Sequence, residues 1–431
     1  MTYIGGVKME LVTTEKQHFG PLAKGCKDCV VGRKSVLFIT GLCHYRCFYC
    51  PISDDKRYKD VVKINERPLL RPDAPEGTVK TIEEIRLCQS TGVGITGGDP
   101  LMRLDRTCRY IEGLKKEFGS SFHIHLYTTL DHVTQEALLR LEKAGLDELR
   151  LHFDVTDILL WEKAHFAEGF QMTIGAEIPS IPGYVEKTKE LIHFCKTLGF
   201  IDFFNLNELE YSDASQHHLK SKSFEVKDSS SYAIRGSEEM ALKLIEFGKQ
   251  LDFPVHYCSA GFKDRVQLGN RLRLRAQSVA RPFDNVDEQG MLFRAELKPI
   301  DRVSVDKTSR EMDYEKDDYE EHEKEVDHVV EKLGLLEEPE YASEIISDDN
   351  TLFEGFTLEG IRQQLIRNYE IPEELIEVQG DRILTAPHIL KEIWPQIKRK
   401  RKFFAWKSLF TASLVTEYPT SDHFPLEREG L

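Results

Sequence analysis

The stretch "GLCHYRCFYC", residues 41–50, decides how this sequence is interpreted, because it places Cys43, Cys47 and Cys50 on one short segment. Three thiolates this close together can converge on a single inorganic centre. Zinc sites usually close with a fourth protein ligand, and iron–sulfur clusters are normally held by four cysteines. Three cysteines on a [4Fe–4S] cube would leave one iron without a protein ligand. The motif therefore predicts an open cluster that can bind another molecule.

The chain around this segment alternates between apolar runs and amphipathic helical patterns. The apolar runs are strand candidates and cover residues 35–40, 92–98, 122–129, 146–154, 170–179 and 200–210. Strands that alternate with helices form βαβ units and a mostly parallel sheet. Six such units predict an α/β fold, a full or partial (β/α)6 barrel with its function at the carboxyl ends of the strands. The cysteine segment follows the first strand and Gly97–Gly98 follow the second, so both fall at that end.

The 431 residues are enough for one large core and a smaller second domain. We expect an N-terminal segment with a C-x2-C pair at residues 1–34, the barrel at 35–282 and a C-terminal α+β domain at 283–431. The net charge of −15 is concentrated in an acidic segment at 311–340, which holds 14 Asp/Glu against 3 Lys. Such a run is typical of a solvated helix or a mobile insertion and says little about the substrate.

The sequence contains no candidate membrane span and no secretory signal. No apolar run approaches the roughly 20 residues that a span needs, and the first residues lack a basic stretch followed by an apolar core. The nine cysteines are clustered and odd in number, which is typical of a reducing compartment and not of a disulfide framework. We therefore expect a cytoplasmic protein with no membrane partner.

The cysteine segment resembles the signature of radical S-adenosylmethionine (SAM) enzymes, CxxxCxΦC, with Tyr49 as the aromatic residue. "GITGGDPL", residues 94–101, is similar to the GGE motif of that family, whose backbone helps to bind the amino group of SAM. Asp99 stands where the family usually has Glu, one methylene longer. The match covers roughly residues 33–260, and the pattern is closest to archaeal and bacterial proteins that resemble the pyruvate formate-lyase activating enzyme.

The resemblance implies an iron–sulfur oxidoreductase with a [4Fe–4S] cluster on Cys43, Cys47 and Cys50 and with SAM on the open iron. In the family, one-electron reduction releases a 5′-deoxyadenosyl radical that abstracts hydrogen. The implied partners are a protein or small-molecule substrate and a reductant such as ferredoxin or flavodoxin. Family members also contact SAM from the ends of the fourth to sixth strands. The implied cofactor-binding residues are Tyr49, Gly97, Gly98, Asp99, His152 or Asp154, Glu177, Ile178, and Asn205 or Asn207.

A second metal site is predicted from "GCKDC", which places Cys26 and Cys29 in a pair that can grip one ion. His256 and Cys258 lie two apart in "PVHYCSAG" and would point to the same face of a strand. If that strand runs beside the N-terminal segment, the four residues could bind zinc or an auxiliary iron–sulfur cluster. In the alternative interpretation, the pair is an unliganded reduced one and Cys258 is simply buried.

Two other functions remain open at this point. An RNA-modifying radical SAM enzyme could use two basic stretches, Lys398 to Lys402 and residues 263–281, to contact phosphates. The first stretch could equally be the charged end of a helix, and the second could pack its leucines and extend its arginines into solvent. A non-catalytic iron–sulfur or zinc protein would instead have a fully coordinated metal and no SAM.

Overall fold

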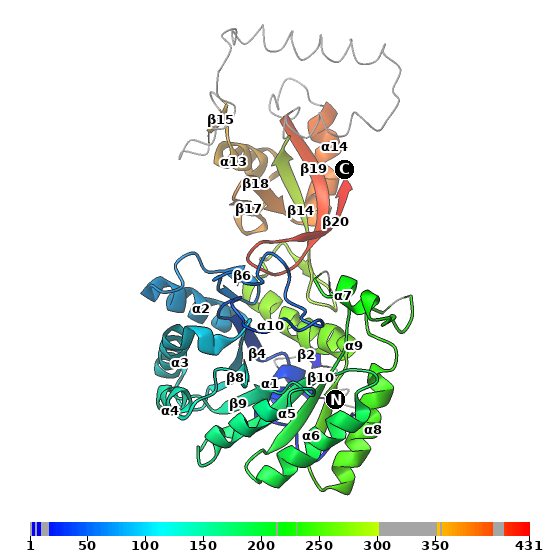
Figure 1. Cartoon of the computed structure of the whole chain (residues 1–431). Coiled ribbons are helices and arrows are strands. Elements are labelled where there is room, and N and C mark those ends of the chain that lie inside the picture. The colour runs from blue at the N-terminus through cyan, green and yellow to red at the C-terminus, as the bar shows by residue number, and fades with distance from the viewer. Residues whose placement is uncertain are drawn as a thin grey trace, which may run out of the picture. The chain divides into compact units, whose positions relative to one another are not determined.

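The computed structural model describes residues 2–4 and 7–9, residues 17–300 without 213 and 230, and residues 351–353, 356–399 and 409–431. The chain divides into two units (Figure 1). The first comprises residues 1–279, 288–291 and 419–423, and the second comprises residues 280–287, 292–418 and 424–431. The acidic segment at 311–340 lies outside the described residues.

The first unit is built on one curved sheet with the strand order β3-β12-β11-β10-β9-β8-β7-β4-β5-β6. Its parallel strands are β4 (Lys34–Phe38), β7 (Gly92–Thr96), β8 (His123–Thr129), β9 (Glu148–His152), β10 (Thr173–Ser180), β11 (Phe203–Glu208) and β12 (Val255–Cys258). The short strands β3 (His18–Phe19), β5 (Lys63–Ile64) and β6 (Arg67–Pro68) are antiparallel additions at the two edges. The predicted barrel is confirmed as a partial one, and β12 extends the six predicted strands.

Helices connect successive parallel strands and line the outside of the sheet (Figure 1). They are α2 (Pro75–Leu87), η2 (Pro100–Arg103), α3 (Leu104–Phe118), α4 (Gln135–Ala144), α5 (Ile158–Trp161), η3 (Glu162–Ala167), α6 (Val185–Leu198), α7 (Gln216–Ser221) and α8 (Ser237–Gln250), with α9 (Ala260–Phe262), η4 (Lys263–Leu268) and α10 (Gly269–Val279) after β12. Local signals set their ends: the Thr134 hydroxyl accepts the N–H of Ala137 at the start of α4, and Gly145 ends it in a left-handed conformation.

Each parallel strand separates an apolar outer face from a polar inner face. On β8 and β9, Ile124, Leu126, Leu149 and Leu151 belong to the core shared with the helices. Because side chains alternate along a strand, the residues between them, such as Tyr127 and those discussed below, face the interior of the barrel. The polar inner face is where a site can form.

The N-terminal helix α1 (Lys24–Val30) belongs to the first unit, where it contacts β4, β7 and β8. The N–H of Gly25 donates to Glu148 Oε2 at 3.2 Å, and a Cβ on Gly25 would lie 2.6 Å from His125 Nδ1. Glu148 is the first residue of β9. The helix therefore packs at the amino end of the strands, away from the cysteine segment that follows β4.

The second unit is an antiparallel sheet with the order β17-β18-β14-β19-β20, and β13 pairs with β14. Its elements are β13 (Asn285–Val286), β14 (Leu292–Pro299), α13 (Leu358–Tyr369), η5 (Glu373–Leu375), β17 (Ile376–Gln379), β18 (Arg382–Thr385), α14 (Pro387–Arg399), β19 (Phe410–Glu417) and β20 (Pro425–Gly430). Two hairpin pairs complete the description: β1 (Thr2–Ile4) with β2 (Val7–Met9), and β15 (Thr351–Phe353) with β16 (Phe356–Thr357). The unit is α+β, as predicted.

The two faces of this second sheet differ. Ala295 and Leu297 of β14 pack with both helices in an apolar core. Arg294, on the opposite face, pairs with Asp284 and Glu417, with Nε–Oδ1 and NH1–Oε1 distances of 2.8 and 3.0 Å. All three of these charged side chains are shielded almost completely from solvent. Of the basic run Lys398 to Lys402, the structure describes only Lys398 and Arg399, which end α14.

Candidate active site

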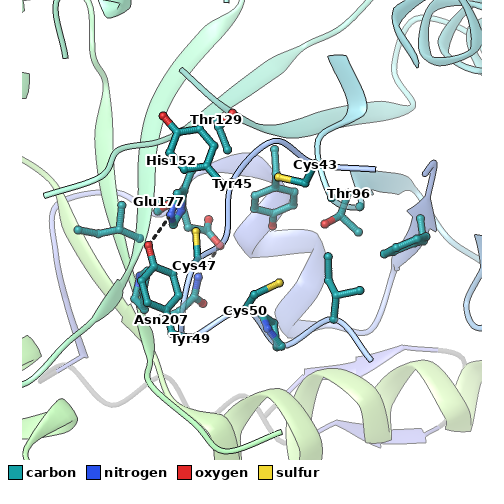
Figure 2. Close-up of a pocket in the computed structure, with 18 of the residues that line it drawn as sticks. Cys43, Tyr45, Cys47, Tyr49, Cys50, Thr96, Thr129, His152, Glu177 and Asn207 are labelled. Atoms are coloured by element: carbon teal, nitrogen blue, oxygen red, sulfur yellow. Dashed lines mark hydrogen bonds between the residues drawn. The ribbon is translucent and has the colours of Figure 1, made fainter. Parts of the chain in front are cut away.

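A cavity of about 540 Å³ opens at the carboxyl ends of the barrel strands. Cys43, Cys47 and Cys50 line it, and Figure 2 shows their sulfur atoms turned toward the same space. The other labelled residues come from the cysteine segment and from successive strands: Tyr45, Tyr49, Thr96 of β7, Thr129 of β8, His152 of β9, Glu177 of β10 and Asn207 of β11. Residues far apart in the sequence thus meet around one opening.

The first residue of the cysteine segment, Gly41, is crossed by a later part of the chain. The Gly41 N–H donates to the Lys59 carbonyl at 2.8 Å, and its own carbonyl accepts from Tyr58 N at 2.8 Å. A Cβ on Gly41 would lie 1.7 Å from the Lys56 carbonyl oxygen, so no other residue fits. At the other end, Arg57 donates to the Cys50 carbonyl at 3.0 Å. Protein contacts therefore hold both ends of the segment.

A carboxylate reinforces this crossing. Asp60 accepts from the Thr40 hydroxyl at 2.8 Å and from two nitrogens of Arg106, the closer at 2.6 Å. Burial opposes ionisation, but these hydrogen bonds hold the pKa of Asp60 well below its usual range. The Asp60 carboxylate is therefore ionised, and it holds Thr40, the residue that precedes Gly41.

Gly97 and Gly98 bring the second strand against the cysteine segment. Gly98 N donates to the Thr40 carbonyl at 2.8 Å. A Cβ on Gly97 would lie 2.3 Å from Thr40 O, and one on Gly98 would lie 2.2 Å from Leu42 O. Both glycines line the cavity, as expected. Their lack of a side chain, however, is needed for contact between two protein segments, and the sequence had suggested contact with a ligand instead.

Asp99 is not among the residues that line the cavity, and its expected contact with the cofactor stays a prediction. Its carboxylate is fully buried and accepts from Leu101 N at 3.0 Å, from the Thr128 hydroxyl at 2.7 Å and from the Thr129 hydroxyl at 2.5 Å. Thr128 and Thr129 do line the cavity. Asp99 therefore positions the end of β8 and reaches the site only through these two residues.

Tyr49 is held by a chain of hydrogen bonds. Its hydroxyl lies 3.0 Å from His152 Nε2, and His152 Nδ1 lies 3.1 Å from the Glu177 carbonyl oxygen. Because a carbonyl only accepts, Nδ1 carries the hydrogen and Nε2 accepts from the Tyr49 hydroxyl. Burial lowers the pKa of His152, which favours this neutral form.

The Glu177 carboxylate is the main acidic group of the cavity wall. Arg150 and Asn205 donate to Oε2 at 2.7 and 2.9 Å, and Asn207 donates to Oε1 at 2.8 Å. Burial acts to raise the pKa of Glu177, but Arg150 and the two amides lower it, so the group is ionised. Asn207 lines the cavity and Asn205 does not. Asn205 instead reaches inward and donates to Cys26 Sγ at 3.4 Å.

A smaller cavity of about 310 Å³ lies on the other side of Tyr49. Ile178 lines both cavities, whereas Asp154 lines only the smaller one. Asp154 Oδ1 accepts from the backbone and hydroxyl of Thr156 at 2.8 and 2.7 Å, so it orders the turn after β9. Of the two alternatives at the end of the fourth strand, only His152 faces the main cavity.

Arg150 was missed from the sequence although its signal was present. "ELRLH" alternates Glu148, Arg150 and His152 with leucines, and such residues share one face of a strand. Arg150 is 2% exposed in its side chain and bonds Glu148 at 2.7 Å and the Tyr127 hydroxyl at 3.1 Å, besides Glu177. Arg150 therefore orients the Glu177 carboxylate from inside the barrel.

The four residues of the predicted second metal site lie on α1 and β12. β12 does pair with β3, where His256 lies opposite His18. In the described chain, however, no three of the ligand atoms of Cys26, Cys29, His256 and Cys258 lie within 4.8 Å of one another. Cys26 accepts instead from Arg150, and Cys258 packs near Val30, Phe262 and Val266. Cys26 and Cys29 are buried and Cys258 is half-buried, and the shared metal site stays a prediction.

The basic stretch at 263–281 is largely occupied by internal contacts. Leu272 and Leu274 are buried, and Arg275 makes a two-pronged ion pair with Glu84 at 2.8 and 2.9 Å. Lys263 lines the cavity 3.6 Å from Glu210. These side chains are committed to packing and pairing, whereas Arg265 and Arg281 of the same stretch are exposed.

The three cavity cysteines fit an iron–sulfur cluster better than a single ion. In a tetrahedral zinc site, thiolate sulfurs lie under about 4 Å apart, but these three sulfurs are not within 4.8 Å of one another as a group. Burial raises the pKa of Cys43 to about 11 and also raises that of Cys47. The free thiols therefore keep their protons, and an inorganic centre must displace them on binding. The wide spacing argues against a zinc-stabilised scaffold.

Two family models match this chain, and a curated relative matches most of its length. The model of the "Radical SAM superfamily" matches residues 37–201, and a "Domain of unknown function (DUF8061)" matches residues 351–431. A protein of Methanocaldococcus jannaschii with the name "Putative glycyl-radical enzyme activating enzyme" is 37% identical over 398 residues, which cover 90% of this chain and 96% of the relative.

Solved structures give weaker similarities. Methylornithine synthase (PylB) is 14% identical, with a TM-score of 0.35, over 53% of this chain and 70% of its own. The radical S-adenosylmethionine methyltransferase TsrM from Kitasatospora setae is 11% identical, with a TM-score of 0.34, over 58% of this chain and 53% of its own. Within the described residues, every helix is too short or too polar to cross a membrane.

Proposed function

This chain belongs to the radical SAM superfamily, and we propose from that premise that its substrate is a protein: a glycyl-radical enzyme, from which it removes a glycine Cα hydrogen. The support is the length of the relationship. The 37% identity to the M. jannaschii protein extends over 90% of this chain and therefore cannot come from the barrel alone. A shared cofactor domain would account for similarity only in the first unit.

The chemistry requires one electron and one hydrogen atom. Bound to this chain, a [4Fe–4S] cluster and SAM would supply methionine and a 5′-deoxyadenosyl radical when a ferredoxin- or flavodoxin-type reductant delivers one electron. Hydrogen transfer from the glycine Cα then yields 5′-deoxyadenosine and leaves the unpaired electron on the partner protein. The chain itself must hold the cofactors, orient them and keep water from the cavity.

We assign the cluster to Cys43, Cys47 and Cys50, which line one cavity. In the described chain, these cysteines do not form a group with a carboxylate or an imidazole that could bind a single metal ion. His152 orients Tyr49, which is among the residues that line both cavities. A soft, all-thiolate donor set favours iron–sulfur binding.

We assign SAM to the polar wall opposite the cysteines. Glu177 is ionised, and three of its roughly four lone-pair positions are filled by Arg150, Asn205 and Asn207. The remaining acceptor position can take a hydroxyl or ammonium group of the cofactor. Gly97 and Gly98 supply backbone groups at the end of β7, and Ile178 supplies an apolar surface shared by both cavities.

The same proposal places the protein in the reducing cytoplasm. All nine cysteines are free thiols, and Cys26, Cys29, Cys88, Cys108 and Cys195 are buried. Free thiols in this number are typical of proteins that stay reduced.

The decisive experiment follows the hydrogen atom. A glycyl-radical enzyme from the same cell is produced with α-deuterated glycine and incubated without air with the cluster-loaded chain, SAM and dithionite. We expect one deuterium in each 5′-deoxyadenosine, detected by mass spectrometry, and a glycyl radical on the partner, detected by electron paramagnetic resonance. The Cys47→Ala variant is the matched control and should give neither.

Two outcomes would contradict the proposal. One is turnover of SAM with undeuterated 5′-deoxyadenosine in the presence of the labelled partner. The other is stimulation of turnover by the small-molecule fraction of a cell extract and not by its protein fraction, which would point to a metabolite as the substrate.

A further inference from the structure

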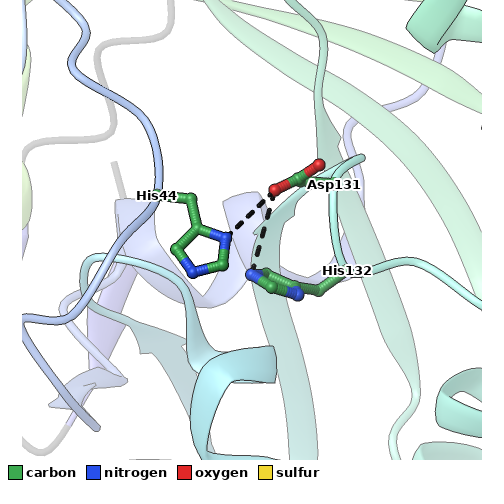
Figure 3. Close-up of side chains that lie close together, drawn as sticks. All are labelled: His44, Asp131 and His132. Carbon is green, nitrogen blue, oxygen red and sulfur yellow. Dashed lines mark hydrogen bonds and ion pairs between the residues drawn. The ribbon is translucent and has the colours of Figure 1, made fainter.

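Three polar side chains meet beside the cysteine segment, outside the cavity. His44 follows Cys43 directly, and Asp131 and His132 follow the end of β8. Figure 3 shows their side chains turned toward one another. His44 Nδ1 lies 3.3 Å from Asp131 Oδ2, and His132 Nε2 lies 4.0 Å from the same oxygen. All three candidate ligand atoms lie within 4.8 Å of one another.

We propose that His44, Asp131 and His132 bind a divalent transition-metal ion such as Zn²⁺, separate from the cluster. Imidazole nitrogen and carboxylate oxygen are common ligands of such ions. Metal–ligand bonds of about 2.0–2.2 Å place the ligand atoms of a tetrahedral site roughly 3.3–3.6 Å apart. Of the two separations from Asp131 Oδ2, the one to His44, 3.3 Å, lies in this range, and the one to His132, 4.0 Å, exceeds it by about 0.4 Å.

His132 gives an independent indication of a ligand. Its Nε2 atom is buried and has no hydrogen-bond partner among the described residues. The 4.0 Å to Asp131 Oδ2 is too long for a hydrogen bond. A buried polar nitrogen without a partner costs free energy, and such groups are rare in folded proteins. An ion held between His132 and Asp131 would satisfy this nitrogen.

The nearby ammonium group of Lys163 does not occupy Asp131 Oδ2, the proposed ligand atom. Lys163 Nζ donates to the Asp131 backbone carbonyl at 2.6 Å and lies 3.9 Å from Oδ1. Oδ2 is the oxygen that both imidazoles approach. The His44 side chain is 57% exposed, so an ion can enter from solvent and keep water in a fourth position.

The position of the site gives it a structural consequence. His44 and Asp131 are 87 residues apart in the chain, and His44 is adjacent to a cavity cysteine. An ion bound here would join the cysteine segment to the connection between β8 and α4. It would restrain the outer side of that segment, whereas Gly41 and Arg57 restrain its two ends.

The test is zinc binding to the full chain after its cluster has been loaded. One equivalent of Zn²⁺ is titrated against a chelating indicator, and the zinc environment is read by X-ray absorption. We expect one zinc per chain with nitrogen and oxygen neighbours at about 2.0–2.1 Å. His44→Ala and His132→Ala should each lower the zinc affinity by more than about tenfold, since even outer-shell losses cost that much. His193→Ala, on the exposed side of α6, should leave it unchanged.

Asp131→Asn tests the carboxylate with almost no change in shape, and thermal unfolding of each variant verifies that it is folded. We expect Asp131→Asn to weaken zinc binding at an unchanged midpoint of unfolding. Sulfur neighbours near 2.3 Å would mean that the zinc is on cysteines and would overturn the proposal. So would an unchanged zinc affinity in folded His44→Ala and His132→Ala.

Discussion

Both sheets of this protein bury an arginine between carboxylates, and within the described residues one of these two networks borders the cysteine cavity. In the barrel, Arg150 pairs with Glu148 and Glu177, and Glu177 lines the cavity. In the second unit, Arg294 pairs with Asp284 and Glu417 on a sheet face. Both arginine side chains are 2% exposed. Buried charge alone therefore does not mark a site, whereas buried charge with one group left facing an opening does.

The difference also concerns how completely polar groups are satisfied. Next to Arg150, the fully buried ring of His125 has no hydrogen-bond partner for either nitrogen among the described residues. Residual polar capacity of this kind is costly in a purely structural core. The barrel keeps this unsatisfied imidazole next to Arg150. In the second unit, the charged groups of Arg294, Asp284 and Glu417 pair with one another. We expect mutations in the two networks to separate binding from stability.

The largest separation is expected at the cavity cysteines. Cys47→Ala should abolish cluster binding and all SAM cleavage, because it removes one of three thiolate ligands. Cys108→Ala, a buried core cysteine of the same unit, should leave cluster and cleavage in place and only lower stability. Iron content and 5′-deoxyadenosine formation measure the contrast. Cleavage that survives in Cys47→Ala would remove the cavity from its assigned role.

The next contrast compares the two arginines directly. Arg150→Met and Arg294→Met each leave buried carboxylates unpaired, so each should lower the free energy of unfolding by about 3–5 kcal/mol. Only Arg150→Met should also weaken SAM binding, since Glu177 loses the donor that keeps it ionised and oriented. Denaturant unfolding and SAM binding by calorimetry distinguish these effects. Equal SAM affinity in both folded variants would erase the proposed distinction.

Two buried groups, His256 in the first unit and Glu417 in the second, should respond to acid with opposite sign. Burial lowers the pKa of His256 in β12 to about 4 from 6.5, so stability is complete above pH 6.5 and is lost as the pH falls toward 4. This loss amounts to about 2 kcal/mol by pH 5. Burial instead raises the pKa of Glu417 in β19, and this contribution is retained in acid and lost as the pH rises. Amide hydrogen exchange in β12 and β19 between pH 7 and 5 should show protection falling in β12 only. A parallel fall in both strands would contradict the assignment.

Asp99 should behave as a positioning residue. In Asp99→Asn, an NH2 group replaces one of the two carboxylate oxygens that accept from the Thr128 and Thr129 hydroxyls. At least one of these hydroxyls then loses its acceptor, which should lower the free energy of unfolding by about 1–3 kcal/mol. We expect the iron content to be unchanged and the Kd for SAM to rise, because Thr128 and Thr129 line the cavity. Thr107→Val, which removes a buried hydrogen bond to Pro100 outside the cavity, is the matched control. If Asp99→Asn and Thr107→Val bind SAM equally well, Asp99 has no part in the site.

The smallest effect is expected at Tyr49. Tyr49→Phe removes the hydrogen bond to His152 and keeps the ring, so SAM affinity should fall by about 1 kcal/mol or roughly fivefold. Tyr110→Phe loses a hydrogen bond of similar length, 2.9 Å to the Pro72 carbonyl, away from the cavity. It should change stability by a similar amount and SAM affinity not at all. If Tyr49→Phe lowers stability and leaves SAM affinity unchanged, the hydrogen bond to His152 stabilises the fold and has no part in SAM binding.

The parts of this protein that were predictable from sequence are those encoded locally. The strands follow from runs of β-forming residues, and the convergence of Cys43, Cys47 and Cys50 follows from their spacing on one segment. The partners of Asp99 lie 29 and 30 residues away in the sequence, and no periodicity connects them. The distance between Cys26 and His256 likewise depends on the path of the whole chain between them, which no local pattern in the sequence encodes. Arg150 was readable in principle, because a charge that alternates with leucines marks an inner face.

The crossing of the chain at Gly41 has a consequence for the entropy of cofactor loading. Ordering a loop costs conformational entropy that grows with its length, and a ligand that must order the loop has its affinity reduced by that cost. Here Lys59, Tyr58 and Arg57 already fix both ends of the cysteine segment through protein contacts alone. The entropy of closing the segment is therefore lost when the barrel folds. The binding of a cluster does not have to offset this entropy, in contrast to small zinc domains that fold only around their ion.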